Sequence, residues 1–304
     1  MRLFSFAVRG GRTGNGIRGW IVEQVVGMGK QKIAEYYNYT IPFYQIFWHG
    51  ETHAVHYGFW EESTKTVEEA LLNENRFLAE LARITPTDKV LDAGTGIGGS
   101  AIWLAKKRGC RVVGITLSEK QVARAREYAQ KAGVAALTEF HIKDYAATGF
   151  PNGSFDVVWA IESVCHTEDK RAFFREAFRI LKPKGRIVIA DGFLLRDIKE
   201  VEKGAYRNFL DGLVLPDLWR VEDFKSIMEN IGFREVKYFD KTEAVKPSSL
   251  ILFRKCLTWY PVFAVARVLR LIPELLWNNG KAGLAQYKLV QSGLIGYGVF
   301  QGIK

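Results

Sequence analysis

Apolar runs and amphipathic stretches alternate along the middle of this 304-residue chain. The runs are short and nearly all apolar, which is typical of strands buried in a parallel sheet. Amphipathic stretches between them indicate helices that cover the sheet. The expected strands are Val90–Asp92, Arg111–Thr116, Glu139–Tyr145, Phe155–Ile161, Arg186–Asp191 and Phe233–Asp240, and the expected helices include Ser100–Lys107, Arg171–Leu181 and Val221–Ile231. This alternation predicts an α/β fold with a doubly wound, mostly parallel sheet.

The turn after the first expected strand is rich in glycine. Asp92 closes the strand, and Gly94, Gly96, Gly98 and Gly99 follow before the next helix. Glycine lets the backbone approach a ligand closely, and a helix N-terminus lies just beyond. The spacing matches neither the P-loop nor the dinucleotide-binding fingerprint. The turn is therefore a candidate cofactor site, and the alternative is that it is only a tight connection.

The second strand is followed by another candidate segment. Thr116 and Leu117 end the strand, and Ser118 precedes Gln121 at the spacing of a helix capping box. Many cofactor folds place an acidic residue at this strand end to hold ribose hydroxyls, and this chain has none there. Gln121 is expected to cap the helix or to face a ligand, and the two roles are compatible.

A carboxylate stands where the expected central strand, Phe155–Ile161, ends. Open α/β sheets bind ligands at the carboxyl ends of their strands. Glu162, followed by His166 four residues later, is therefore a candidate catalytic pair. The alternative is that Glu162 caps the following helix and His166 packs beneath it.

Three motifs together resemble a known enzyme family. Asp92-x-Gly-x-Gly-x-Gly98 resembles motif I of class I S-adenosylmethionine-dependent methyltransferases. The segment Gly114-Ile-Thr-Leu-Ser-x-x-Gln121 is similar to that of tocopherol methyltransferases and cyclopropane synthases. Ile161-Glu-Ser-Val-Cys-His166 resembles sterol C-methyltransferases and tocopherol methyltransferases. The resemblance covers roughly residues 36–238.

The resemblance implies a Rossmann-like sheet of seven strands, with S-adenosylmethionine as the cofactor and no metal. It implies that Glu162 and His166 are catalytic. The cofactor-binding residues that it implies are Asp92, Gly94, Gly96, Gly98, Thr116, Leu117, Gln121, Asp144, Tyr145 and Ile161.

Aromatic residues gather before the glycine turn, and a further segment, residues 194–219, interrupts the pattern after the strand that ends at Asp191. Aromatic faces stabilise cations, so these segments are expected to form an acceptor pocket and its lid. The alternatives are that the aromatic side chains belong to the core and that residues 194–219 only cap the sheet edge. The expected pocket residues are Tyr37, Tyr44, Trp48, His56, Tyr206 and Trp219.

The composition is that of a folded enzyme, with 48% hydrophobic and 25% charged residues. Three scattered cysteines without disulfide or metal spacing favour a reducing compartment, and we expect a cytoplasmic protein. No hydrophobic run is long enough to predict a membrane span, and the first residues lack the apolar stretch of a secretory signal.

The net charge of +10 comes from the two ends of the chain. Residues 1–35 carry +4 and residues 254–304 carry +6, whereas residues 36–253 are neutral. We therefore divide the chain into a basic N-terminal segment, a methyltransferase domain and a basic C-terminal extension. Basic, apolar ends indicate attraction to an anionic membrane surface rather than to nucleic acid. The alternatives are that the ends pack on the domain or that they attract a phosphorylated substrate.

These observations predict a C-methyltransferase that acts on an isoprenoid or related lipid of the sterol, tocopherol or prenyl type. An alkene acceptor would become a carbocation on methylation, and Glu162 would remove a proton with the help of His166. One alternative is an O- or N-methyltransferase of a small natural product, and another is a cyclopropanating fatty-acid enzyme. A cofactor-binding protein without chemistry is disfavoured by the intact glycines, Glu162 and His166.

Overall fold

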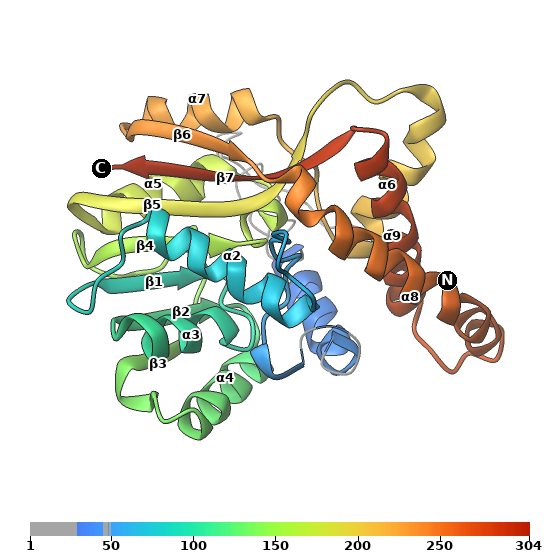
Figure 1. Cartoon of the computed structure of the whole chain (residues 1–304), viewed down its shortest axis with the longest axis horizontal. Helices are drawn as coiled ribbons and strands as arrows, with labels where there is room; N and C mark the ends of the chain where they lie inside the picture. Colours follow the sequence, from blue (N-terminus) through green and yellow to red (C-terminus); the bar gives the residue numbers. More distant parts are fainter. Residues whose placement is uncertain (1–28, 45–47, 49) are drawn as a thin grey trace, which may run out of the picture.

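The computed structural model describes residues 29–44, 48 and 50–304. Its centre is a sheet of seven strands in the order β3-β2-β1-β4-β5-β7-β6 (Figure 1). The first five strands in this order run parallel to one another, whereas β7 runs antiparallel to both β5 and β6. The predicted doubly wound, mostly parallel sheet is confirmed. The strands are β1 (Lys89–Ala93), β2 (Arg111–Thr116), β3 (Thr138–Ile142), β4 (Phe155–Ile161), β5 (Leu181–Leu194), β6 (Arg234–Asp240) and β7 (Ile295–Ile303).

Helices cover both faces of the sheet because successive side chains of each strand point to opposite faces. In β4, Val157 and Trp159 pack in one core with α2, α3 and α4. Val158 and Ala160 pack in the other core with α5 and α7. The helices of these two layers are α2 (Val67–Leu81), α3 (Gly99–Arg108), α4 (Glu119–Lys131), α5 (Lys170–Ile180) and α7 (Val221–Ile231).

A helical insertion joins β6 to β7. Neighbouring antiparallel strands need only a short hairpin, yet α8 (Thr242–Val268) and α9 (Glu274–Gln291) separate these two. In Figure 1 the insertion lies beside the sheet with α6 (Lys203–Leu213), and the far end of α8 projects away from the sheet. We refer to residues 241–294 as the α8/α9 insertion.

The insertion corrects the expected domain boundaries. The predicted boundary at residue 254 falls inside α8, and β7 lies between β5 and β6 within the sheet. Residues 254–304 are therefore part of the domain and not a separate extension. Most of the predicted N-terminal segment, residues 1–28, lies outside the described residues, whereas residues 29–44 form a helix.

The structure also corrects the expectation about membrane-spanning length. Within the described residues, one helix is long and apolar enough to cross a membrane by length and composition alone, and this is α8. Ser248, Ser249 and Lys255 interrupt the run, so no unbroken apolar stretch marks it in the sequence.

Candidate active site

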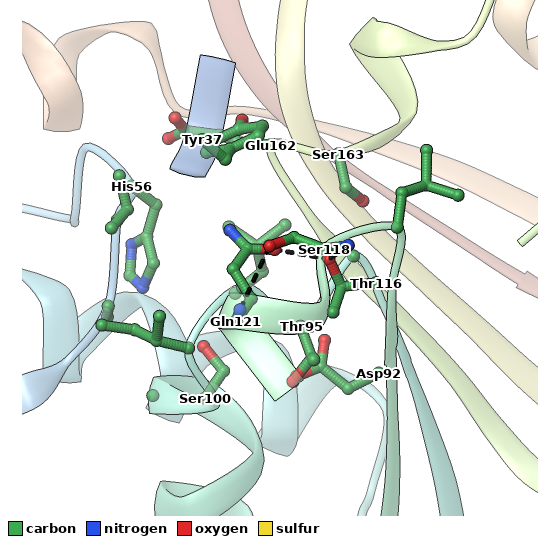
Figure 2. Close-up of a pocket in the computed structure, with 18 of the residues that line it drawn as sticks. Tyr37, His56, Asp92, Thr95, Ser100, Thr116, Ser118, Gln121, Glu162 and Ser163 are labelled. Carbon is green, nitrogen blue, oxygen red and sulfur yellow. Dashed lines mark hydrogen bonds between the residues drawn. The ribbon is translucent and has the colours of Figure 1, made fainter. Parts of the chain in front are cut away.

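A set of adjoining pockets lies at the carboxyl ends of β1, β2 and β4, where the sequence predicted a ligand site (Figure 2). The first pocket is bordered by the glycine turn after β1 and the segments after β2 and β4. A second pocket extends toward α6, and a third lies against α8 and α9. Tyr44, Val55 and Glu162 line all three, so these residues stand where the pockets meet.

The glycine turn forms the floor of the first pocket. Gly94 has a φ of 89° and Gly96 a φ of 55°, in the left-handed region that favours glycine. A Cβ at Gly94 would lie 2.4 Å from the Cβ of Ser163, whereas a Cβ at Gly96 would meet no atom of the described residues within 4 Å. Gly94 thus admits close packing of the turn against the end of β4. Gly96 leaves the space above the turn open for a ligand.

Asp92 stabilises the glycine turn through a hydrogen bond to the next polar residue, Thr95. Its side chain is buried, and its carboxylate accepts a hydrogen bond of 2.7 Å from the Thr95 hydroxyl. Burial raises the pKa of Asp92 to about 6. The acid therefore holds the turn in place while keeping a polar oxygen beside the pocket.

The segment after β2 is organised by three polar side chains. The Ser118 hydroxyl accepts a hydrogen bond of 3.1 Å from the Gln121 backbone N–H, which is the predicted cap of α4. The Thr116 hydroxyl donates to Oε1 of Gln121. This contact fixes the orientation of the Gln121 amide at the pocket wall, so the Ser118 side chain and not that of Gln121 caps α4.

Glu162 follows β4 in an uncommon backbone conformation. Its φ is 45°, a left-handed value that costs free energy for a residue with a Cβ. Its N–H donates to the Ala190 carbonyl at 2.8 Å, and Oε1 accepts a hydrogen bond of 2.7 Å from the Tyr57 N–H. Burial, and secondarily the charge of Glu74, raise the pKa of Glu162 well above its usual value. A raised pKa makes this carboxylate a stronger base once it is ionised.

His166 is paired with Tyr37 from the helix over residues 29–44. Nε2 of His166 lies 2.7 Å from the Tyr37 hydroxyl, and Nδ1 lies 3.3 Å from the Val214 carbonyl. Because a carbonyl can only accept, Nδ1 carries the hydrogen and Nε2 accepts from Tyr37. Burial lowers the pKa of His166 to about 4, so the imidazole is neutral near pH 7.

A second histidine is held by a buried carboxylate. Nδ1 of His56 lies 2.7 Å from Oε2 of Glu74, and both side chains are buried. Glu74 also accepts hydrogen bonds from the Gly58 N–H at 2.9 Å and the Tyr297 hydroxyl at 2.7 Å. Nε2 of His56 is buried without a hydrogen-bond partner among the described residues. His56 also lines the first and third pockets.

The second pocket has a mainly apolar and aromatic wall. Phe209 and Leu213 of α6 line it, together with Leu215, Leu218 and the ring of Tyr297. Asp191 at its edge is buried, and its carboxylate accepts hydrogen bonds from two backbone N–H groups, those of Cys165 at 2.8 Å and Gly192 at 2.9 Å. This wall suits the apolar part of a small molecule.

Most of the residues singled out in the sequence meet at these pockets. Those that line them are Asp92, Gly94, Gly96, Thr116, Leu117, Gln121, Tyr145, Ile161, Glu162, His166, Tyr37, Tyr44, Trp48 and His56.

Four of the predicted residues lie elsewhere. Gly98 is the N-cap of α3, and a Cβ there would lie 3.0 Å from Ala125 of α4, so it serves packing. Asp144 forms an ion pair of 2.6 Å with Lys30.

Two of these four are aromatic residues of the expected lid. Tyr206 is buried in the core between α6 and α9 and donates to the Asp217 carboxylate. Trp219 packs on the core of α5 and α7, with Nζ of Lys170 5.2 Å from its ring centroid. Both aromatic residues fill cores beneath the expected lid instead of the pocket.

Sequence reasoning missed Glu74, Tyr57 and Tyr297. A signal for Glu74 exists, because it lies on the buried face of α2 with Leu71 and Leu78, three and four residues away. A carboxylate at an apolar-face position needs a buried partner. Tyr297 carried no comparable signal, because it reaches the site only through the pairing of β7.

Comparison with known proteins agrees with this geometry. The profile of the family described as methyltransferase domain matches residues 91–189. The chain is 32% identical over 194 residues to 27-O-demethylrifamycin SV methyltransferase of Amycolatopsis mediterranei, which covers 64% of this chain and 71% of that protein. It is 30% identical over 257 residues to the chloroplastic tocopherol O-methyltransferase of Arabidopsis thaliana, covering 78% of this chain and 73% of that one.

Among solved structures, one similar fold is that of geranyl diphosphate C-methyltransferase from Streptomyces coelicolor, in complex with Mg²⁺, geranyl diphosphate and S-adenosyl-L-homocysteine. The TM-score is 0.70 at 18% identity, over 90% of this chain and 97% of that chain. At this identity the likeness concerns the fold.

Proposed function

Because the chain belongs to the class I S-adenosylmethionine-dependent methyltransferases, we propose that it methylates a carbon atom of an isoprenoid or related lipid. The observation that carries this proposal is the position of Glu162. Glu162 lines both the pocket over the glycine turn and the pocket beside α6, so its carboxylate stands where the two pockets meet. A base at that junction is what a carbon acceptor needs after methylation.

The residues around the first pocket fit S-adenosylmethionine. The open space above Gly96 admits a ligand that approaches the backbone, and Asp92 and Gln121 offer fixed polar atoms at the wall. We assign cofactor binding to Asp92, Gly94, Gly96, Thr116, Leu117, Gln121, Tyr145 and Ile161, with Gly98 and Asp144 supporting their loops from outside the pocket. When bound, the cofactor supplies a methyl group activated by a sulfonium.

Glu162 completes the reaction by taking a proton. Addition of a methyl group to one carbon of an alkene leaves a cation on the neighbouring carbon. The rings of Tyr37, Tyr57 and Tyr297 border the apolar pocket, and aromatic faces stabilise such a charge. Loss of a proton from the adjoining carbon to the Glu162 carboxylate restores a neutral alkene. For an aromatic-ring acceptor the same carboxylate takes the ring proton.

His166 acts through its contact with Tyr37. Nε2 of the neutral His166 imidazole accepts a hydrogen bond from the Tyr37 hydroxyl. This bond fixes the Tyr37 ring at the second pocket, which Glu162 also lines. We therefore assign His166 the task of orienting Tyr37 against the acceptor.

The lipid character of the acceptor is supported by the second pocket. Leucine and phenylalanine side chains from α6 and the residues after it form its wall, and such a wall binds hydrocarbon through apolar burial. The similarity to a tocopherol O-methyltransferase points to the same class of acceptor.

The His56–Glu74 pair favours O-methylation as a second candidate function. A carboxylate-oriented imidazole whose Nε2 has no hydrogen-bond partner among the described residues is suited to take the proton of a hydroxyl group. Two similar proteins are named as O-methyltransferases or as acting on an O-demethyl compound. The two candidates assign the base to different residues, so they can be separated by mutation.

The test uses labelled methyl transfer from S-adenosylmethionine to a lipid extract and, separately, to a polar metabolite extract. After the labelled product is identified, Glu162→Gln and His56→Asn are compared under single turnover. For C-methylation, Glu162→Gln should lower the rate by about a hundred- to ten-thousand-fold, whereas His56→Asn should change it little. Calorimetry should find near-normal cofactor affinity for Glu162→Gln.

The opposite pattern would assign the base to His56 and favour O-methylation. Label that appears only in the polar extract would reject a lipid acceptor. Near wild-type turnover in Glu162→Gln with a C-methylated product would reject its role as the base.

A further inference from the structure

The far end of α8 exposes a concentration of apolar side chains. Seven of the twelve large hydrophobic residues that the described part of the chain exposes fall within residues 257–271, which we call the α8 tip. Val262, Val265 and Val268 lie three residues apart and so share a helix face, and Val268 is 81% exposed. The tip continues through Leu269 and Leu271, which is 72% exposed. An apolar surface of this kind marks an interaction site.

The first half of α8 is held by the domain. Ser248 accepts a hydrogen bond of 2.8 Å from Nε1 of Trp60, and Ser249 donates at 2.6 Å to Oε1 of Gln286 in α9. Only the second half, residues 257–268, projects from the protein (Figure 1). At about 1.5 Å per residue, that half is shorter than the hydrocarbon core of a bilayer, about 30 Å. The geometry therefore suits insertion at the membrane surface and not a complete span.

The segment that carries this apolar surface has an excess of basic residues. Between residues 254 and 281 the chain carries five basic residues and one acidic residue. The acidic residue, Glu274, is already paired with Arg267 at 3.0 Å. Exposed Arg254 precedes the tip in sequence, and exposed Arg270 lies within it between Leu269 and Leu271. Apolar residues beside excess positive charge are the pattern of a helix that binds anionic lipid at the interface.

The third pocket connects the tip to the reacting site. Leu252 and Cys256 of α8 line it together with Gly283 of α9, and Glu162 lines its inner end. Cys256 immediately precedes the first exposed apolar residue of the tip, Leu257. The third pocket therefore reaches the base of the tip, where α8 and α9 pack closely together.

We propose that the α8 tip inserts into the surface of an anionic lipid bilayer and that the acceptor reaches the third pocket from there. The route rests on the proposed lipid acceptor, whereas bilayer binding does not. The partner is the bilayer itself, recognised by its hydrocarbon through the valines and leucines and by its negative headgroups through Arg254 and Arg270.

The test is flotation of the full chain with phosphatidylcholine vesicles that contain or lack phosphatidylglycerol. We expect binding to the anionic vesicles only. The variant Val265→Ser/Leu269→Ser/Leu271→Ser should weaken it about tenfold or more, since three apolar side chains leave the lipid. Val201→Ser, which changes a side chain 89% exposed outside the tip, is the matched control and should bind as wild type. Arg254→Gln/Arg270→Gln should weaken binding and reduce its salt dependence.

Equal binding of the tip variant and the wild type would overturn the proposal, and so would equal binding to both vesicle types. A thermal melt establishes that each variant is folded. Once a lipid acceptor is identified, the tip variant should lose turnover with acceptor embedded in vesicles and keep it with a short-chain soluble acceptor. Equal loss with both would reject the entry route. Anionic vesicle binding with unchanged turnover in Glu162→Gln would reject only the proposed chemistry.

Discussion

The two sides of the site are built in different ways. The side toward β1 and β2 consists of short turns in which backbone conformation and local hydrogen bonds do the positioning, as at Gly94, Gly96 and Thr116. The side toward α6, α8 and α9 consists of apolar and aromatic side chains that come from distant parts of the chain. Glu162 stands between them. The first side offers fixed hydrogen-bonding atoms to a ligand, whereas the second offers a mainly apolar surface.

The first prediction perturbs the polar side alone. Gly96→Val should weaken S-adenosylmethionine binding by about tenfold or more, or about 1.4 kcal/mol, because its side chain would occupy the open space of the pocket. Gly133→Val is the matched control, since Gly133 also has a positive φ of 71° with no atom near its Cβ. Both substitutions place a valine at a positive φ, so both variants bear the cost of that backbone conformation. Of the two positions, only Gly96 borders the pocket.

Calorimetry on both folded variants measures this difference. Equal cofactor affinity in Gly96→Val and Gly133→Val would remove the glycine turn from the cofactor site.

The second prediction perturbs the apolar side alone. Leu213→Ala should raise the KM for a lipid acceptor several-fold, because one buried aliphatic side chain contributes about 1–3 kcal/mol to binding. Cofactor affinity should not change. Leu210→Ala, in the same helix and the same core cluster but outside the pockets, should leave the KM near the wild-type value. A change in cofactor affinity in Leu213→Ala alone would mean that the two sides are not independent.

The third prediction concerns His166, where the two sides touch. Its pKa should lie at about 4, because burial disfavours the charged imidazole. The unfolded chain takes up this proton near pH 6.5. This residue therefore opposes folding increasingly as the pH falls from about 6.5 toward 4. Ring ¹⁵N shifts measure the titration and should identify the hydrogen on Nδ1. Titration near 6.5 would mean that the ring is not desolvated.

The contrast between the two sides also explains what the sequence could predict. Asp92, Gly94, Gly96, Gln121 and Glu162 lie within or next to their own strand ends, so a local pattern predicts their placement. The sheet was predictable for the same reason, since each parallel strand is marked by its own apolar run.

The apolar side depends on contacts that no local pattern contains. Tyr206 and Trp219 are aromatic residues of the kind expected in a pocket, yet tertiary packing places them in two separate cores. Tyr297 reaches Glu74 across 223 positions of sequence. The pairing of β7 with β5 and β6 is equally remote, which is why residues 254–304 read as an extension.

The position of β7 has a consequence for how the protein is made. On the ribosome, β6 emerges well before its only neighbour in the sheet, because the α8/α9 insertion must be synthesised between them. Until β7 arrives, the edge of β5 and the whole of β6 present unpaired backbone groups, and open strand edges promote aggregation. The same insertion that brings apolar surface to the site thus delays closure of the sheet. Nascent chains of this protein should depend on chaperones during that interval, and expression at low temperature should favour the soluble product.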